Sequence, residues 1–128
     1  LLSYATEVMI VALKKLGVKV EWESNMQTLV VHGSGGKLAL PGSELYMGSE
    51  ATASRFMTTA VNLIESEGSV LITGNKRMHE RPTNDLVQAL QASGCSIEYI
   101  SKDGSLPLKI DTSAKGWNGG GVNLAADV

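Results

Sequence analysis

The sequence contains little cysteine, few aromatic residues and no long apolar run. Cys95 is the only cysteine among 128 residues, which excludes an internal disulfide and leads us to expect a reducing, cytoplasmic setting. No apolar run approaches the roughly 20 residues that span a bilayer, and no signal peptide is recognisable. With 5% aromatic residues and a net charge of −2, neither nucleic acid nor a membrane is expected as a partner.

Recognisable metal ligands and nucleophilic sets are also missing. His32 and His79 have no second ligand at metal spacing, so no metal site is expected. Cys95 is interpreted as a small packed residue rather than a nucleophile. The segment Gly33-Ser34-Gly35-Gly36 has the composition of a phosphate loop, but it leads into a predicted strand and is interpreted as a hairpin turn.

What the sequence does contain is an internal repeat. Residues 6–22 (TEVMIVALKKLGVKVEW) align with residues 83–99 (TNDLVQALQASGCSIEY), and Gly17 falls on Gly94, an offset of 94 − 17 = 77. Each copy has apolar residues at helical spacing, then a glycine, then an alternating strand. The length and composition suit one domain, so we expect one α/β body with copies at about 6–40 and 83–126.

Further elements are predicted within and between the copies. Second strands are expected at Thr28–Val31 and Leu106–Ile110, and glycine-rich segments lead into apolar stretches at 37–40 and 122–125. The copies are separated by a short strand, a helix from about Thr52 to Glu65, and a strand at Ser69–Thr73. The sequence therefore holds one complete unit of helix–strand–strand–helix–strand and only part of a second. We therefore expect an open sheet edge, an uncovered apolar face and marginal stability or self-association there.

An arginine lies near the predicted start of the helix at Thr52. Arg55 is expected in its first turn, where unpaired N–H groups and the helix dipole disfavour a cation. Such a position is favourable when an anion binds between the arginine and the helix, since both recognise phosphate and carboxylate groups.

A second basic segment follows the strand Ser69–Thr73. Pro82 is a favoured first residue of a helix, which places Lys76, Arg77 and Arg81 just ahead of that helix. If the two helices lie side by side, one anion site results. The alternative is that the arginines pair with carboxylates on a solvated surface. The candidate carboxylates are Glu50, Glu80 and Asp85.

These two segments resemble the motifs of a known family. Leu45–Arg55 is similar to the pattern Leu-Tyr/Phe-Leu-Gly-Asn-Ala-Gly-Thr-Ala-x-Arg of 5-enolpyruvylshikimate-3-phosphate synthase. Ile72–Pro82 and Leu86–Leu90 are similar to its pattern Leu-Thr-Gly-x-x-Arg-Met-x-Glu-Arg-Pro followed by Leu-Val-x-Ala-Leu. The likeness runs along essentially the whole chain. Residues 6–9, 18–22 and 104–110 look most like the fungal form, which is one domain of the pentafunctional AROM polypeptide.

The resemblance implies a fold and a reaction. The family has two domains of repeated βαβαββ units in an inside-out barrel, of which residues 1–128 would be a partial first domain of about one and a half units. The reaction, in the shikimate pathway to chorismate and the aromatic amino acids, transfers the enolpyruvyl group of phosphoenolpyruvate to the 5-hydroxyl of shikimate 3-phosphate. It releases phosphate and needs no cofactor.

The resemblance also assigns residues to the anion pocket. Ala51 takes the position of the loop glycine whose backbone lies against phosphoenolpyruvate, and Arg81 that of the arginine that binds it. The positions of Thr52, Arg55 and Arg77 support the same pocket. No catalytic residue is implied within the chain.

Several positions depart from the family pattern. Ser49-Glu50-Ala51 replaces Asn-Ala-Gly, and Tyr4-Ala5 replaces an acidic pair. The Ala51 methyl is expected to hinder glyphosate, which occupies the phosphoenolpyruvate site, more than the smaller substrate. Glu50 would repel an anion if it pointed inward, and would favour the helix N-terminus if it pointed outward.

The family motifs absent from the sequence lead us to expect that the chain alone is inactive. The Lys-Ser…Arg motif would lie upstream of Leu1, where the chain starts without a methionine, and the Ser-Ser-Gln motif would follow Val128. The family's catalytic residues lie in the other domain. Two alternatives stay open: a degenerate or redesigned domain that serves as a binding or folding module, and an α/β domain whose arginines are only surface charge.

Overall fold

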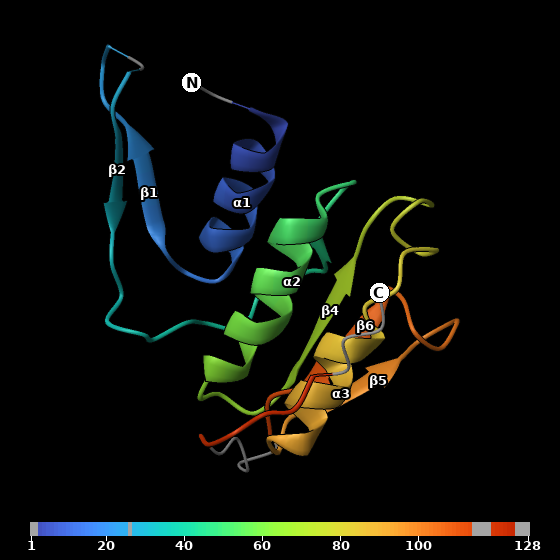
Figure 1. The fold of residues 1–128 in the computed structure, drawn as a ribbon. Helices are drawn as coiled ribbons and strands as arrows, with labels where there is room; N and C mark the ends of the chain where they lie inside the picture. Colours follow the sequence, from blue (N-terminus) through green and yellow to red (C-terminus); the bar gives the residue numbers. More distant parts are fainter. Residues whose placement is uncertain (1–2, 26, 114–118, 125–128) are drawn as a thin grey trace.

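The computed structural model describes residues 3–25, 27–113 and 119–124 (Figure 1). In this part of the chain the helices are α1 (Tyr4–Lys15), α2 (Ala51–Ala60), the 3-10 turn η1 (Val61–Leu63) and α3 (Asn84–Ala92). The strands are β1 (Lys19–Trp22), β2 (Leu29–His32), β3 (Leu45–Tyr46), β4 (Ser69–Thr73), β5 (Ser96–Tyr99) and β6 (Leu108–Asp111). The α/β fold class is confirmed.

The strands form two sheets. β1 and β2 make an antiparallel pair, and the other four lie in the order β3-β4-β6-β5. Within the larger sheet only β3 and β4 are parallel, with Leu45 opposite Ile72, while β6 runs antiparallel to both of its neighbours. Figure 1 shows α2 and α3 on the same side of this sheet, with α1 and the β1–β2 hairpin beside them.

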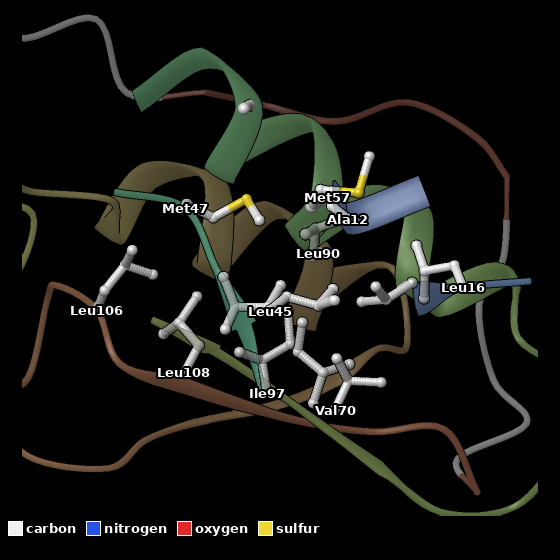
Figure 2. Packing of buried hydrophobic residues seen from close by; sticks show 14 of the residues in the cluster. Ala12, Leu16, Leu45, Met47, Met57, Val70, Leu90, Ile97, Leu106 and Leu108 are labelled. Carbon is white, nitrogen blue, oxygen red and sulfur yellow. The ribbon is translucent and has the colours of Figure 1, made fainter. Parts of the chain in front are cut away.

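The core lies between the four-stranded sheet and the helices. β6 alternates buried and exposed residues, as expected for a strand with one face toward a core. Leu45, Leu108 and Ile110 are fully buried, and Figure 2 shows Leu45 packed near Leu108 and Ile97. Leu16, at the end of α1, belongs to the same cluster. α1 therefore places one face in this core and turns the other toward the hairpin.

The two copies of the repeat form corresponding elements in different surroundings. β1 and β5 occupy Lys19–Trp22 and Ser96–Tyr99, an offset of 77 at both ends (96 − 19 and 99 − 22). In the second copy β6 pairs with β4, whereas no described strand pairs with the outer edge of β2. In the second copy Val87, Ile97 and Ile110 are buried, so the uncovered apolar face predicted there is wrong, and an apolar surface lies open on the first copy instead. It is a hollow of about 300 Å³ between α1 and the β1–β2 hairpin.

Two predicted elements are corrected. The helix predicted for Thr52–Glu65 stops at Ala60 and continues only as a 3-10 turn. The side chain of Asn62 donates to the carbonyls of Thr58 (2.8 Å) and Thr59 (3.4 Å), which competes with the helical hydrogen bonds there. The helix predicted to begin at Pro82 begins at Asn84, with Thr83 as its N-cap.

The predicted strand at 37–40 is also wrong. Residues 37–40 pair with no strand among the described residues. The N–H of Ala39 donates to the Leu16 carbonyl at the end of α1 (2.8 Å), while Leu38 and Leu40 pack against the core. The glycine-rich segment ahead of it is therefore a loop and not a hairpin turn. Residues 122–124 contain no strand, and residue 125 lies outside the described residues.

Candidate functional site

The two arginine-bearing segments meet because β3 and β4 are parallel. The Met47 N–H donates to the Thr73 carbonyl (2.7 Å), and the Asn75 N–H donates to the Gly48 carbonyl (2.9 Å). A Cβ on Gly74 would lie 2.7 Å from that same Gly48 oxygen. Open α/β sheets bind ligands beyond the carboxyl ends of their parallel strands, so this contact marks the candidate site.

The N-terminus of α2 has no side-chain cap. Gly48 has a φ of +55°, and the Glu50 N–H closes the turn onto the Met47 carbonyl (3.0 Å). Glu50 is the N-cap residue, yet its carboxylate makes no capping hydrogen bond. Ala51 is the first helical residue and is half-buried. The N–H groups of this first turn can therefore donate hydrogen bonds to a bound anion.

Arg55 lies one turn further along than predicted. Because α2 begins at Ala51, Arg55 is its fifth residue and belongs to the second turn. Its side chain is exposed, and Nη2 donates to the Pro82 carbonyl at 3.3 Å. Arg55 thus links α2 to the segment ahead of α3 through a side-chain contact that the sequence pattern did not reveal.

The segment between β4 and α3, residues 74–83, is here called the arginine loop. Met78 anchors it in the core and is 3% exposed, while Arg77 and Arg81 are exposed. Nε2 of His79 lies 3.0 Å from Oγ1 of Thr73, the last residue of β4. The arginine loop thus presents its two guanidinium groups to solvent from a fixed backbone.

The candidate arginines form no ion pairs in the described part of the chain. The ion pairs found there join Glu21 to His32 and Glu98 to Lys109. The predicted pairing of Arg55, Arg77 and Arg81 with Glu50, Glu80 or Asp85 is therefore not found. Within 4.0 Å, no described carboxylate neutralises these three cations.

Two hollows lie beside the arginine loop. The larger, of about 490 Å³, is lined by Arg55, by residues 82–86 and by Leu124. The smaller, of about 350 Å³, lies between the arginine loop and residues 102–105. Neither is lined by Ala51, Thr52, Arg77 or Arg81. The geometry thus brings Arg55 to the start of α3 but does not gather all five predicted residues around one hollow.

Sequence reasoning missed the neighbour of Gly48. A Cβ on Gly48 would overlap the hydroxyl oxygen of Tyr4, the first residue of α1. Tyr4 is 51% exposed, so its ring borders the approach to the α2 N-terminus. Two departures from the family pattern, at Tyr4 and at Ser49-Glu50-Ala51, therefore lie close together, which no local sequence pattern could reveal.

Other site types find no support among residues 3–25, 27–113 and 119–124. These residues contain no group of three or more His, Cys, Asp or Glu side chains that could hold a metal ion. None of their helices is long and apolar enough to cross a membrane. Cys95 is buried, and burial raises the pKa of its thiol, as expected for a packed residue.

Comparison with known proteins gives one family. Residues 1–128 match the family model of EPSP synthase (3-phosphoshikimate 1-carboxyvinyltransferase). Two solved structures of EPSP synthase from Acinetobacter baumannii cover 93% of this chain at 24% identity, with TM-scores of 0.74 and 0.70. The likeness to these structures is one of fold, and the chain spans only 24% and 25% of their lengths.

Proposed function

The chain belongs to the EPSP synthase family, and we propose that it is part of an enzyme of the shikimate pathway. The complete protein would transfer the enolpyruvyl group of phosphoenolpyruvate to the 5-hydroxyl of shikimate 3-phosphate and release phosphate. We further propose that the chain is a partial first domain of the fungal AROM type, that the enzyme is cytoplasmic, and that residues 1–128 alone do not catalyse the reaction.

One observation carries the proposal. Three arginines that form no ion pair with any described residue lie on two segments that meet at the carboxyl ends of β3 and β4. They lie beside a helix N-terminus without a side-chain cap. Unpaired guanidinium groups and free N–H groups together favour an anion. Both proposed substrates carry phosphate, and phosphoenolpyruvate also carries a carboxylate, so this region has the charge that they require.

Within this proposal each residue has a role. The Ala51 backbone and the Arg81 guanidinium contact phosphoenolpyruvate, while Thr52, Arg55 and Arg77 support the pocket. These groups bind and orient the anion. Binding the phosphate favours the transfer, because negative charge builds on it when its bond to the enolpyruvyl carbon breaks, after that carbon has bonded to the 5-hydroxyl oxygen of shikimate 3-phosphate. The proton transfers are assigned to parts of the protein outside residues 1–128.

A second candidate is a binding or folding module without catalysis. The Glu50 carboxylate at the start of α2, the Ala51 methyl and the Tyr4 ring over Gly48 all change the approach to the proposed phosphoenolpyruvate site. A carboxylate near the site opposes an anionic ligand. This candidate would be favoured if the complete, folded protein bound neither substrate.

The test is phosphoenolpyruvate binding and phosphate release by the complete protein. Replacing Arg81 by glutamine should weaken binding about 10- to 100-fold, since a hydrogen bond to a charged group contributes about 1.5–3 kcal/mol. The matched control is Lys37→Gln, which removes an exposed charge from a loop elsewhere and should leave binding unchanged. Equal effects would contradict the role of Arg81, and phosphate release by residues 1–128 alone would contradict their inactivity.

A further inference from the structure

The arginine loop contains one titratable side chain with a hydrogen bond into the fold. Among the ionisable side chains of residues 74–83, only His79 makes a hydrogen bond with another described residue, between its Nε2 and Oγ1 of Thr73 at 3.0 Å. Arg77 precedes it by two residues and Arg81 follows it by two. Both arginines are exposed, so the backbone around His79 sets where their guanidinium groups can reach.

Both hydroxyls that contact His79 are buried, and they belong to different segments, the end of β4 and the loop ahead of β6. Thr73 is 9% exposed and ends β4, and its carbonyl also accepts the Met47 N–H that leads into the α2 turn (2.7 Å). Ser105 is 2% exposed and donates its hydroxyl proton to the His79 carbonyl (2.5 Å). The ring of His79 is thus held by Thr73 at the end of β4, and its backbone carbonyl is held by Ser105 in the segment ahead of β6.

The neighbouring contacts make the His79 ring the central anchor of the loop. The start of the loop is fixed where the Asn75 N–H donates to Gly48 (2.9 Å), and its end where the Thr83 N–H donates to the Gly104 carbonyl (2.8 Å). Between these ends, the His79 ring and the buried Met78 side chain hold the middle. A bound anion needs its donors held to within about 0.5 Å. For the guanidinium groups of Arg77 and Arg81, that precision depends on how firmly the middle of the loop is held.

We propose that His79 is a positioning residue, whose hydrogen bond to Thr73 holds Arg77 and Arg81 in the geometry that binds a phosphate or carboxylate group. The inference rests on the proposed function, because phosphoenolpyruvate is the anion that the arginines would bind. His79 does not itself contact the ligand. Its loss would leave the buried Thr73 hydroxyl without this partner, and the middle of the loop would be held only by the Met78 side chain and the hydrogen bond from Ser105 to the His79 carbonyl.

The test compares four variants and one control variant of the complete protein by phosphoenolpyruvate titration calorimetry and thermal melting. His79→Leu should weaken binding about 5- to 20-fold, whereas His79→Gln, whose amide can reach Thr73, should stay within about twofold of the unchanged protein. Thr73→Val should match His79→Leu, and the double variant should lose nothing further. His32→Leu is the control, because the His32 ring likewise makes a hydrogen bond to a neighbouring side chain, that of Glu21, but lies on β2, away from the arginine loop.

A second readout separates positioning from general stability. Amide hydrogen exchange at residues 76–82 should be faster in His79→Leu than in His79→Gln, while exchange in β4 and β6 stays unchanged. If the unchanged protein does not bind phosphoenolpyruvate, the proposed function fails, and the exchange result still tests the anchoring. Unchanged exchange and unchanged affinity in His79→Leu would overturn the inference, as would equal losses in the leucine and glutamine variants.

Discussion

At the scale of single residues, two glycines allow the candidate site to form. Gly48 adopts a positive φ under the Tyr4 ring, and Gly74 faces the Gly48 carbonyl at a distance that excludes any side chain. The loops after β3 and β4 can then lie in direct contact, which brings the α2 N-terminus to the arginine loop. Small residues are therefore required here by the close approach of two backbones.

Replacing Gly74 by alanine should destabilise the fold by about 1–3 kcal/mol, as expected for overpacking. The new Cβ would lie 2.7 Å from the Gly48 oxygen and 2.9 Å from Cβ of Met78, and a backbone oxygen cannot move aside cheaply. Gly42→Ala is the matched control, since nothing lies within 4 Å of its Cβ position. Urea denaturation would measure both, and equal stabilities would show that the two loops separate in solution.

Cys95 should react slowly with thiol reagents. It is 8% exposed, and burial raises the pKa of its thiol above the usual value, so at neutral pH the reactive thiolate fraction is smaller than in a free thiol. The rate should rise as pH increases beyond the ordinary cysteine range. Labelling with a chromogenic disulfide, with and without urea, measures this. Rapid labelling of the folded chain at neutral pH would mean that Cys95 is accessible.

At the scale of elements, α2 is the helix whose start decides what the site can bind. Glu50 supplies a negative charge at the helix N-terminus, which favours the helix, but it makes no capping hydrogen bond. The same charge opposes an anionic ligand at the free N–H groups. Stability of the helix and affinity of the site therefore place opposite demands on this position.

Glu50→Gln should accordingly strengthen phosphoenolpyruvate binding by the complete protein severalfold, with a helix cost of about 0.3–1 kcal/mol. Its control is Glu44→Gln, which removes an exposed charge ahead of β3 and keeps the backbone carbonyl that accepts Lys15 Nζ (2.8 Å). Calorimetry at two salt concentrations should show that the gain shrinks as salt rises. A loss of affinity in Glu50→Gln would mean that the carboxylate helps to form the site.

Element positions were predictable where local pattern and packing agree. The strand Ser69–Thr73 was predicted with the bounds it has, because its β-branched and apolar run admits few alternatives. The end of α2 was not predictable, because it depends on the carbonyls to which the Asn62 side chain donates. For the site, the pattern indicated which side chains are basic. The reach of Arg55 to Pro82 depends on the parallel pairing of β3 with β4, and the contact of His79 with Thr73 depends on how the arginine loop turns back onto the end of β4.

At the scale of the whole molecule, the repeat produces two copies with unequal burial. Val87, Ile97 and Ile110 of the second copy are at most 6% exposed. Ile10 of the first copy is only half-buried, and Val31 is 51% exposed. The difference arises because β6 has β4 beside it, whereas the outer edge of β2 has no strand partner among the described residues.

This asymmetry predicts that matched truncations in the two hairpins differ in cost. Ile110→Ala should lower the free energy of unfolding of the chain by about 2–5 kcal/mol, the range for large-to-small changes at a buried site. Val31→Ala, at the corresponding place in the first hairpin, should change it by no more than about 0.5 kcal/mol, because half of that side chain already contacts water. Urea denaturation at several protein concentrations measures both. Equal, large losses would mean that the β1–β2 face is covered in solution, and a dependence on protein concentration would identify a second copy of the chain as the cover.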